Sequence, residues 1–115
     1  MQFTEVEFKD TMPIDGYGPG FFRVGGKVFE GAVLVLPNSV TAWGGYGDAA
    51  ALLALKVDVL FIGTGPETAH IPKPLREALE AAGIGVEPMA SPAACRTYNV
   101  VLAEGRRIAA ALLPV

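Results

Sequence analysis

Charged residues, cysteines and long apolar runs are all scarce in this sequence, and each shortage excludes a class of protein. Charged side chains make up 18% of the 115 residues, below the roughly 25% of an ordinary soluble domain. The 9 Lys and Arg residues are outnumbered by 12 Asp and Glu residues, which gives a net charge of -3. No basic cluster is present, and binding to a phosphate backbone needs clustered cations, so we expect no nucleic acid among the partners.

The single cysteine, Cys95, excludes an intramolecular disulfide framework and a cysteine-based zinc site. The acidic residues are scattered without metal-ligand spacing, so neither a metal nor a cofactor is expected. The longest apolar stretch, from Ala49 to Leu55, ends at Lys56 and is far shorter than the ~20 residues of a membrane-spanning helix. The N-terminal region is acidic rather than cationic, unlike a signal or transit peptide. These features predict a cytoplasmic protein without a membrane span.

The apolar content, 51% of the residues, is high enough to build a substantial core. A length of 115 residues suits one domain, and no linker divides the chain, so residues 1–115 are expected to form a single α/β domain. The low charged fraction is also compatible with a homodimer.

The first half of the sequence predicts antiparallel strands joined by tight turns. Gly25 and Gly26 lie between two short β-prone segments and supply the positive φ that a two-residue hairpin turn requires. The segment 15–20 is rich in glycine and carries Tyr17, and we expect it to be a mobile loop able to contact a partner. The predicted strands are Phe21–Val24, Lys27–Phe29, Gly31–Leu36 and Ser39–Trp43.

The second half alternates helices with strands, which is typical of a mostly parallel sheet. Asp48 and Ser91 are expected to cap the first and third helices, and Pro72 or Pro74 to open the second. The predicted order is helix Ala49–Lys56, strand Val57–Ile62, helix Pro72–Ala82, strand Ile84–Glu87, helix Pro92–Ala103 and strand Arg107–Leu113. The fold class is therefore α/β: a three-layer domain with a central mixed, mostly parallel sheet, helices, and an N-terminal antiparallel β layer.

The segment Gly63-Thr64-Gly65 follows a buried strand and partly matches a dinucleotide-binding fingerprint. Glu87 ends the next strand, where an acidic residue would hold a ribose. Position 68 is Thr instead of glycine, however, and the next helix begins too late to meet a pyrophosphate. The favoured interpretation is a loop that needs a positive φ, at the sheet edge where α/β proteins bind small ligands.

The helix that contains Cys95 allows two interpretations of its thiol. A thiol near a helix N-terminus and beside Arg96 can be a reactive nucleophile, with His70, the only histidine, as its base. Alternatively, Cys95 packs as a small hydrophobic side chain with Tyr98 and Leu102 on the same helix face. The second interpretation is favoured.

Arg96 and Asn99 are polar residues in an otherwise apolar helix, and asparagine is a poor residue for a helix interior. Either they form hydrogen bonds with neighbouring loops, or they line a site for an anion or a peptide carbonyl beside Thr64 and Gly65. The sequence leaves both interpretations open.

Trp43 and Tyr46 flank a glycine-rich turn. Trp43 is expected to be a core aromatic, and the alternative is an exposed aromatic anchor for a protein partner. Both residues are therefore candidate partner contacts.

Several runs of residues, in their order and spacing, carry a family resemblance over nearly the whole chain. They are Ser39-Val40 with Trp43, Ile62–Gly65, Leu75-Arg76 with Leu79, Gly83–Glu87, Ala93–Asn99 and Ala103–Leu112. On these residues the chain resembles a family of small bacterial and archaeal domains that is related to the mitochondrial complex I (NADH dehydrogenase) alpha-subcomplex assembly factor.

The resemblance implies a compact α/β fold with a central mixed sheet and a shared polar surface cleft. Most bacterial members have no assigned activity, while the mitochondrial relative acts with protein partners in building a respiratory complex. Residues that match the family's strand-end loop and helix motif are Gly63, Thr64, Gly65, Arg96, Tyr98 and Asn99.

We therefore expect a non-catalytic protein-interaction or assembly module, with no catalytic residue assigned. Its expected partners are respiratory-complex subunits or assembly proteins. The alternative is a small-ligand-binding protein or minor enzyme that uses a polar cleft around Thr64, Cys95, Arg96 and Asn99.

Overall fold

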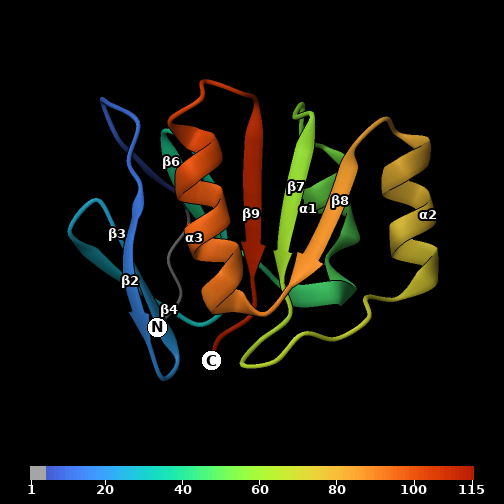
Figure 1. Ribbon diagram of the computed structural model, residues 1–115, viewed down its shortest axis with the longest axis horizontal. Helices are drawn as coiled ribbons and strands as arrows, with labels where there is room; N and C mark the ends of the chain where they lie inside the picture. Colours follow the sequence, from blue (N-terminus) through green and yellow to red (C-terminus); the bar gives the residue numbers. More distant parts are fainter. Residues whose placement is uncertain (1–4) are drawn as a thin grey trace.

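A mixed sheet of six strands divides the molecule into two apolar cores (Figure 1). The structure, a computed structural model, describes residues 5–115. In spatial order the strands are β1 (Glu5–Glu7), β6 (Ser39–Ala42), β5 (Val33–Leu36), β9 (Ile108–Leu112), β7 (Val59–Gly63) and β8 (Gly85–Met89). β7 pairs in parallel with both β9 and β8, whereas the pairings that join β1, β6, β5 and β9 are antiparallel. The sheet is mixed as predicted, but the expectation of a mostly parallel sheet holds only for its second half.

A separate antiparallel sheet is formed by β2 (Ile14–Gly18), β3 (Phe21–Val24) and β4 (Lys27–Glu30). The predicted hairpin at Gly25 and Gly26 is confirmed, because both glycines have positive φ (59° and 79°) and join β3 to β4. The prediction of a mobile loop at residues 15–20 is wrong for most of that segment, because residues 15–18 belong to β2, which pairs with β3. Its glycines favoured a loop, and the long-range pairing that overrides this preference is not visible in the local sequence.

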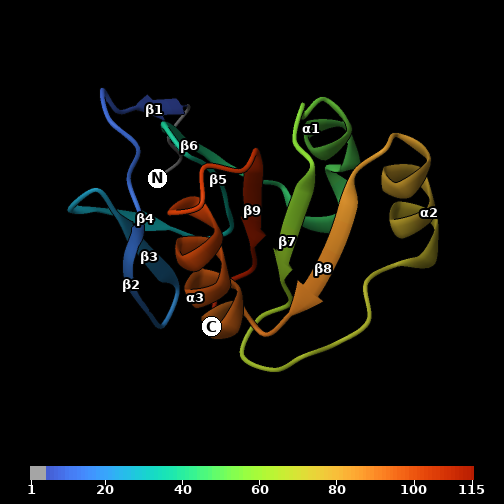
Figure 2. The same cartoon turned by 45° about the horizontal axis from the view of Figure 1, so that its top comes forward.

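Among the described residues, the helical elements are η1 (a 3-10 turn, Gly45–Gly47), α1 (Ala49–Leu53), α2 (Lys73–Ala81) and α3 (Ser91–Leu102). α1 and α2 pack against one face of the six-stranded sheet, whereas α3 and the three-stranded sheet cover the other (Figures 1 and 2). None of the helices that the structure describes has the length and apolarity needed to cross a bilayer.

The predicted helix starts lie within one residue of the observed ones, and one of the two predicted caps is at the cap position. Asp48 is the N-cap residue of α1, as predicted, but its side chain makes no capping hydrogen bond, and its carboxylate instead accepts the backbone N–H of Gly44. Ser91 is the first residue of α3 instead of its cap, and its hydroxyl bonds elsewhere. Pro72 precedes α2 and Pro74 lies in its first turn, so both prolines serve the helix start.

Strand alternation explains why both faces of the central sheet are apolar. Val33 and Val35 of β5 point into the core beneath α3, and Leu34 between them points into the core beneath α1 and α2. β9 follows the same rule, with Ile108, Ala110 and Leu112 in the first core and Ala109 and Ala111 in the second. Because both faces are covered, these strands appear in the sequence as continuous apolar runs. The predicted α/β class, with its antiparallel N-terminal layer, is thereby confirmed.

Candidate functional site

The carboxyl ends of β7, β8 and β9 meet at Ser91, a fully buried residue at the start of α3. The Ser91 hydroxyl donates to the Leu113 carbonyl at 2.6 Å and accepts the Gly65 N–H at 2.9 Å. The Ser91 N–H donates to the Gly65 carbonyl at 2.8 Å, and the Leu113 N–H donates to the Gly63 carbonyl at 2.9 Å. Hydrogen bonds within the chain therefore pair these backbone groups of Gly63, Gly65 and Leu113 at the sheet edge.

Gly63 and Gly65 allow the end of β7 and the loop after it to lie close to Ser91. A Cβ added to Gly63 would lie 2.6 Å from the Ser91 Oγ and 2.9 Å from a methyl carbon of Leu112, so the β7 strand end has no room for a side chain. Gly65 has a φ of +101°, which confirms the prediction that this loop needs a positive φ. Its N–H, which would face a phosphate in a dinucleotide site, is already bonded to Ser91. The geometry thus favours the structural interpretation of Gly63-Thr64-Gly65.

Thr64 organises the loop that follows β7. Its hydroxyl donates to the Glu67 carbonyl at 2.7 Å and accepts the Ala69 N–H at 3.1 Å. Its backbone N–H donates to the Met89 carbonyl at 2.8 Å. The five residues that this arrangement holds outward, 66–70, are all exposed. Thr64 is therefore a loop-shaping residue whose hydroxyl is engaged within the chain.

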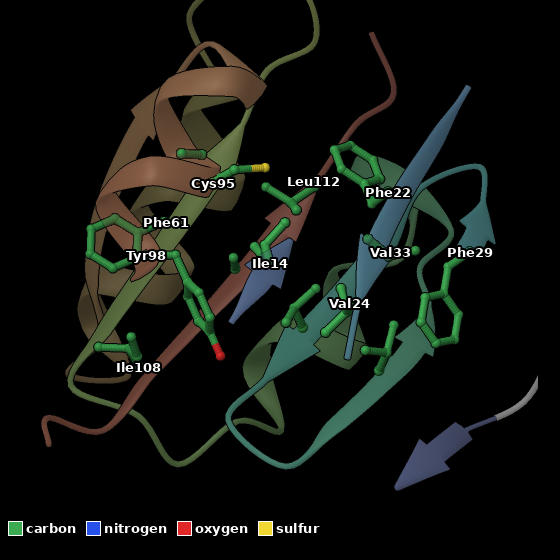
Figure 3. Close-up of a cluster of buried hydrophobic side chains, with 14 residues drawn as sticks. Ile14, Phe22, Val24, Phe29, Val33, Phe61, Cys95, Tyr98, Ile108 and Leu112 are labelled. Atoms are coloured by element: carbon green, nitrogen blue, oxygen red, sulfur yellow. The ribbon is translucent and has the colours of Figure 1, made fainter. Parts of the chain in front are cut away.

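Cys95 and Tyr98 point from α3 into the core beneath it (Figure 3). Cys95 is 4% exposed, and burial raises the pKa of its thiol to about 11 despite the opposing charge of Arg96. His70 is exposed, and its neighbour Ile71 belongs to the core on the opposite face of the sheet. The structure therefore does not bring Cys95 and His70 together, and Cys95 packs as a small hydrophobic side chain, as favoured.

Tyr98 carries an unusual feature for a core residue. Its side chain is fully buried, yet its hydroxyl has no hydrogen-bond partner among the described residues. Burial raises the pKa of this phenol, so it stays protonated. Tyr98 is therefore placed inside the protein, away from any surface cleft.

Asn99 bonds the backbone of β2 rather than the loop after β7. Its Nδ2 donates to the Ile14 carbonyl at 2.9 Å, and its Oδ1 accepts the Ile14 N–H at 2.8 Å. Ser91, which adjoins Gly65, lies eight residues earlier on the helix, or ~12 Å away at 1.5 Å per residue. Of the two interpretations left open for Asn99, the structure shows a hydrogen bond to a neighbouring segment.

Among the predicted cleft residues, Arg96 is the one whose side chain is exposed. Its side chain is exposed and forms no hydrogen bond or ion pair within the part of the chain that the structure describes. Four residues later, Val100 is 64% exposed, the largest value among the exposed large apolar residues that the structure describes. The i, i+4 spacing places both side chains on the outward side of α3. The sequence analysis did not single out Val100, although its helix position relative to buried Tyr98 and Cys95 could have identified it.

Trp43 is 5% exposed and belongs to the core beneath α1 and α2. Its ring meets that of Tyr46 edge to face, with centroids 5.9 Å apart. Burial raises the pKa of Tyr46, which is only half-buried. Trp43 is thus a core aromatic, which is the interpretation that the sequence favoured. Tyr46 is the member of the pair that reaches solvent.

The predicted cleft residues are therefore distributed over three places. Gly63, Thr64 and Gly65 lie at the closed sheet edge, Cys95 and Tyr98 in a core, and Arg96 and Asn99 on the side of α3 near β2. Within residues 5–115, no group of three or more His, Cys, Asp or Glu residues is placed to hold a metal ion.

Comparison with known proteins identifies relatives of this chain. Residues 14–113 match the model of a family described as a protein of unknown function (DUF498/DUF598). An uncharacterized protein of Rhodobacter capsulatus is 50% identical over 113 residues, which cover 96% of this chain and 91% of the relative. The human NADH dehydrogenase [ubiquinone] 1 alpha subcomplex assembly factor 3 is 32% identical over 117 residues. That match covers 94% of this chain but 64% of the human protein, so the chain spans less than two thirds of that relative.

Solved structures share the fold. The crystal structure of a protein from Bordetella parapertussis, a structural genomics target, aligns with a TM-score of 0.84 at 32% sequence identity. The alignment covers 93% of this chain and 98% of the Bordetella chain. The six-stranded sheet and its accompanying layers are thus an arrangement that relatives adopt.

Proposed function

The chain belongs to the DUF498/DUF598 family, and from this membership we propose that it is a non-catalytic protein-interaction module that aids assembly of respiratory complex I. The observation that carries the proposal is its similarity to the assembly factors of animals. The human and zebrafish proteins of that name are 32% and 34% identical to it, over 94% and 88% of this chain. Protein partners follow in general terms from that relationship, and complex I is the specific partner that we infer.

The state of the hydroxyl and thiol groups around the candidate site supports an interaction role over a chemical one. The Ser91 and Thr64 hydroxyls are engaged in bonds that shape the fold, and the lone thiol is buried with its pKa raised to about 11. A nucleophile would need the opposite, namely exposure and a lowered pKa. No observation favours the alternative of a small enzyme built on Cys95.

The surface that we assign to partner contact is the outward side of α3, defined by Arg96 and Val100. An arginine without an internal partner can pair with a carboxylate, and an exposed valine offers apolar area to bury. Arginine is also enriched at protein interfaces relative to the rest of the surface. Tyr46 lies on the opposite side of the sheet and serves as a second candidate contact.

The test is affinity purification of the tagged protein, at native level from its own host, followed by mass spectrometry. We expect complex I subunits or assembly proteins with the wild type and their loss with Arg96→Ala. The matched control is Arg23→Ala, since Arg23 is an exposed arginine on β3. Recovery of the same respiratory proteins with both variants would move the contact away from α3, and their absence from the wild-type sample would refute the assembly role.

A further inference from the structure

β4 is the edge strand of the three-stranded sheet on the side away from α3 (Figures 1 and 2). Among the elements that the structure describes, β3 is the one with extensive contact to it. Lys27, Val28 and Glu30 of β4 are exposed, and Phe29 is buried. The outer edge of β4 is therefore open to solvent, in contrast to the outer edge of β2, against which α3 packs.

This outer edge presents the backbone groups of two residues. In a hairpin with a two-residue turn, the residues next to the turn exchange both backbone hydrogen bonds, and bonded pairs then recur at every second position. Lys27 belongs to the pair next to the turn, and Phe29 to the following bonded pair. Val28 and Glu30 therefore point their N–H and C=O groups away from β3. Neither residue has a hydrogen bond on that side to any residue that the structure describes.

The solvent-facing side of β3 and β4 carries Arg23, Val28 and Glu30. Strand alternation places these side chains opposite to those of Phe22 and Phe29, which point into the core. Arg23 pairs directly with Val28 in the register of the hairpin, and Val28 is 51% exposed. Arg23 and Glu30 are exposed, and neither has an ion-pair partner within residues 5–115. An exposed valine thus lies next to one free cation and one free carboxylate.

We propose that a second copy of this chain binds this edge by antiparallel pairing of β4 with β4, which joins the two small sheets into one continuous sheet. The register that uses every outward backbone group places Val28 opposite Glu30 of the second copy, with the two-fold axis at Phe29. Pairing Val28 with Val28, or Glu30 with Glu30, would leave the outward groups of the other residue without a strand partner.

The same register brings opposite charges together. Across the joined strands, Arg23, Val28 and Glu30 of the second copy lie in one row, which sets the Cα atoms of the two charged residues ~10 Å apart. An arginine and a glutamate side chain extended toward each other span that distance. The guanidinium then pairs with the carboxylate, while the apolar stem of the arginine covers the valine. The two-fold symmetry repeats this contact on the other side of Phe29.

The usual obstacles to strand pairing are not found along β4. Natural edge strands are commonly protected by a lysine, a proline or a bulge. The four residues of β4 include no proline, and their pairing with β3 is regular. Lys27 lies on the core-facing side, with its ammonium 6.0 Å from the centroid of the Phe8 ring. Its charge is therefore directed away from the solvent-facing row that contains Arg23.

The test measures self-association of the full chain by sedimentation equilibrium, between about 5 and 500 µM. Arg23→Glu and Glu30→Arg each place like charges across the dimer contact. Mixing the two variants restores both opposite-charge contacts, but only between different copies, so a pairing within one chain would not respond to mixing. Arg96→Glu, a charge reversal on α3, is the matched control. Circular dichroism and urea unfolding check that each variant folds.

A second pair of variants tests the backbone bonds. Val28→Pro removes an outward N–H, and proline is tolerated where a strand N–H faces away from its sheet. Val28→Ala keeps that N–H and is the control for loss of the valine side chain.

We expect the wild type to form a reversible dimer with a dissociation constant of about 10–100 µM, because four-residue strands make a small interface. Each single charge reversal should weaken it at least tenfold, and an equimolar mixture of the two should return to within about threefold of wild type. Val28→Pro should bind at least tenfold more weakly than Val28→Ala. Arg96→Glu should match the wild type.

The proposal is overturned if the wild type stays monomeric throughout, if it dimerises with the same affinity in all variants, or if mixing restores nothing. It is also overturned if a monomeric wild type captures a host protein that is lost with Val28→Pro, because a foreign segment would then occupy the edge. If Val28→Pro does not fold, the charge reversals and their mixture decide.

Self-association is independent of the assembly role. α3 lies beside β2, on the other side of the small sheet, so Arg96 and Val100 stay accessible in the dimer. A dimer that behaves as expected, together with a host purification free of respiratory proteins, would support the β4 pairing and refute the proposed function. A monomer that captures respiratory proteins through Arg96 would support the function and refute the pairing.

Discussion

Asn99 pairs both polar atoms of its side-chain amide with the backbone N–H and C=O of Ile14, 85 positions earlier in the chain. The two bonds, 2.8 and 2.9 Å long, join α3 to the outer edge of β2. Apolar packing supplies the area of this contact, but it is not directional. The amide therefore fixes the position at which the three-stranded sheet meets the helix.

Replacing Asn99 with Ala should lower the free energy of unfolding by about 1–2 kcal/mol. Both Ile14 backbone groups lose partners in a part-buried place, and the better helix propensity of alanine offsets only part of that loss. Urea unfolding followed by circular dichroism measures the change. Arg96→Ala, one turn away and exposed, is the control and should stay within about 0.5 kcal/mol of wild type. Equal stabilities for the two variants would contradict the role given to the amide.

Ser91→Ala should destabilise the domain by about 1–3 kcal/mol, because a buried Gly65 N–H and the Leu113 carbonyl both lose their partner. The same urea assay applies, with Thr97→Ala on the same helix as the control. A hydroxyl-specific effect predicts that Ser91→Cys, similar in shape but a weak hydrogen-bonding group, recovers little of the lost stability. Full stability of the alanine variant would show that Ser91 does not hold the sheet edge closed.

Gly63→Ala tests the contact between the end of β7 and Ser91 of α3 by adding a methyl group to it. The added methyl would lie 2.6 Å from the Ser91 Oγ and 2.9 Å from Leu112, too close for either contact to persist. We expect a loss of about 1–3 kcal/mol, the usual cost of inserting a methyl group into a packed place. Gly16→Ala, where nothing lies within 4 Å of the new Cβ, is the matched control. A wild-type melting temperature for Gly63→Ala would disprove the close approach of β7 and α3.

Local signals in the sequence were sufficient for most of the fold. The Gly25-Gly26 turn and the prolines around the start of α2 each act on their immediate neighbours, so pattern alone places them. β2 was missed because its glycines favour a loop and only pairing with β3 makes it a strand. The polarity of Asp48 and Ser91 was noticed correctly, but their actual partners depend on how distant segments approach one another.

The candidate site was less predictable, because the surroundings of its residues also depend on the three-dimensional arrangement and not on the local sequence. The sequence grouped Cys95, Arg96, Tyr98 and Asn99 as one motif, yet helical geometry sends them to different environments. Cys95 and Tyr98 turn into the core, Asn99 meets Ile14, and Arg96 faces solvent. Adjacent helix positions differ by ~100° in direction, so proximity in sequence did not imply a shared cleft.

Tyr98→Phe should leave the domain as stable as wild type or more stable by about 1 kcal/mol. The hydroxyl is buried without a partner in the described part of the chain, so it contributes desolvation cost and no compensating bond. Phenylalanine keeps the ring and its packing. Urea unfolding again gives the answer, with Phe22→Leu, which removes real core volume, as a destabilised reference. A loss above about 1 kcal/mol for Tyr98→Phe would reveal a bound water or other partner at the hydroxyl.

The Cys95 thiol should make stability fall in alkaline solution. Burial raises its pKa in the folded protein to about 11 from the ordinary value of 9.0, so the unfolded chain loses its proton first as the pH rises. The contribution of the protonated thiol is thus complete below pH 9 and disappears as the pH approaches 11. Tyr98, whose phenol pKa is also raised, acts in the same direction, so the comparison must isolate the thiol. Unfolding free energies of wild type and Cys95→Ala, measured between pH 7 and about 10.5, provide that comparison.

The difference in stability between wild type and Cys95→Ala should shrink across this range. In parallel, the folded thiol should react with iodoacetamide at pH 8 about 100-fold more slowly than a thiol of ordinary pKa, because its thiolate fraction is that much smaller. Unfolding in urea should restore the ordinary rate. A constant stability difference, or fast alkylation of the folded protein, would mean that Cys95 reaches solvent, and the thiol would again be a candidate nucleophile on α3.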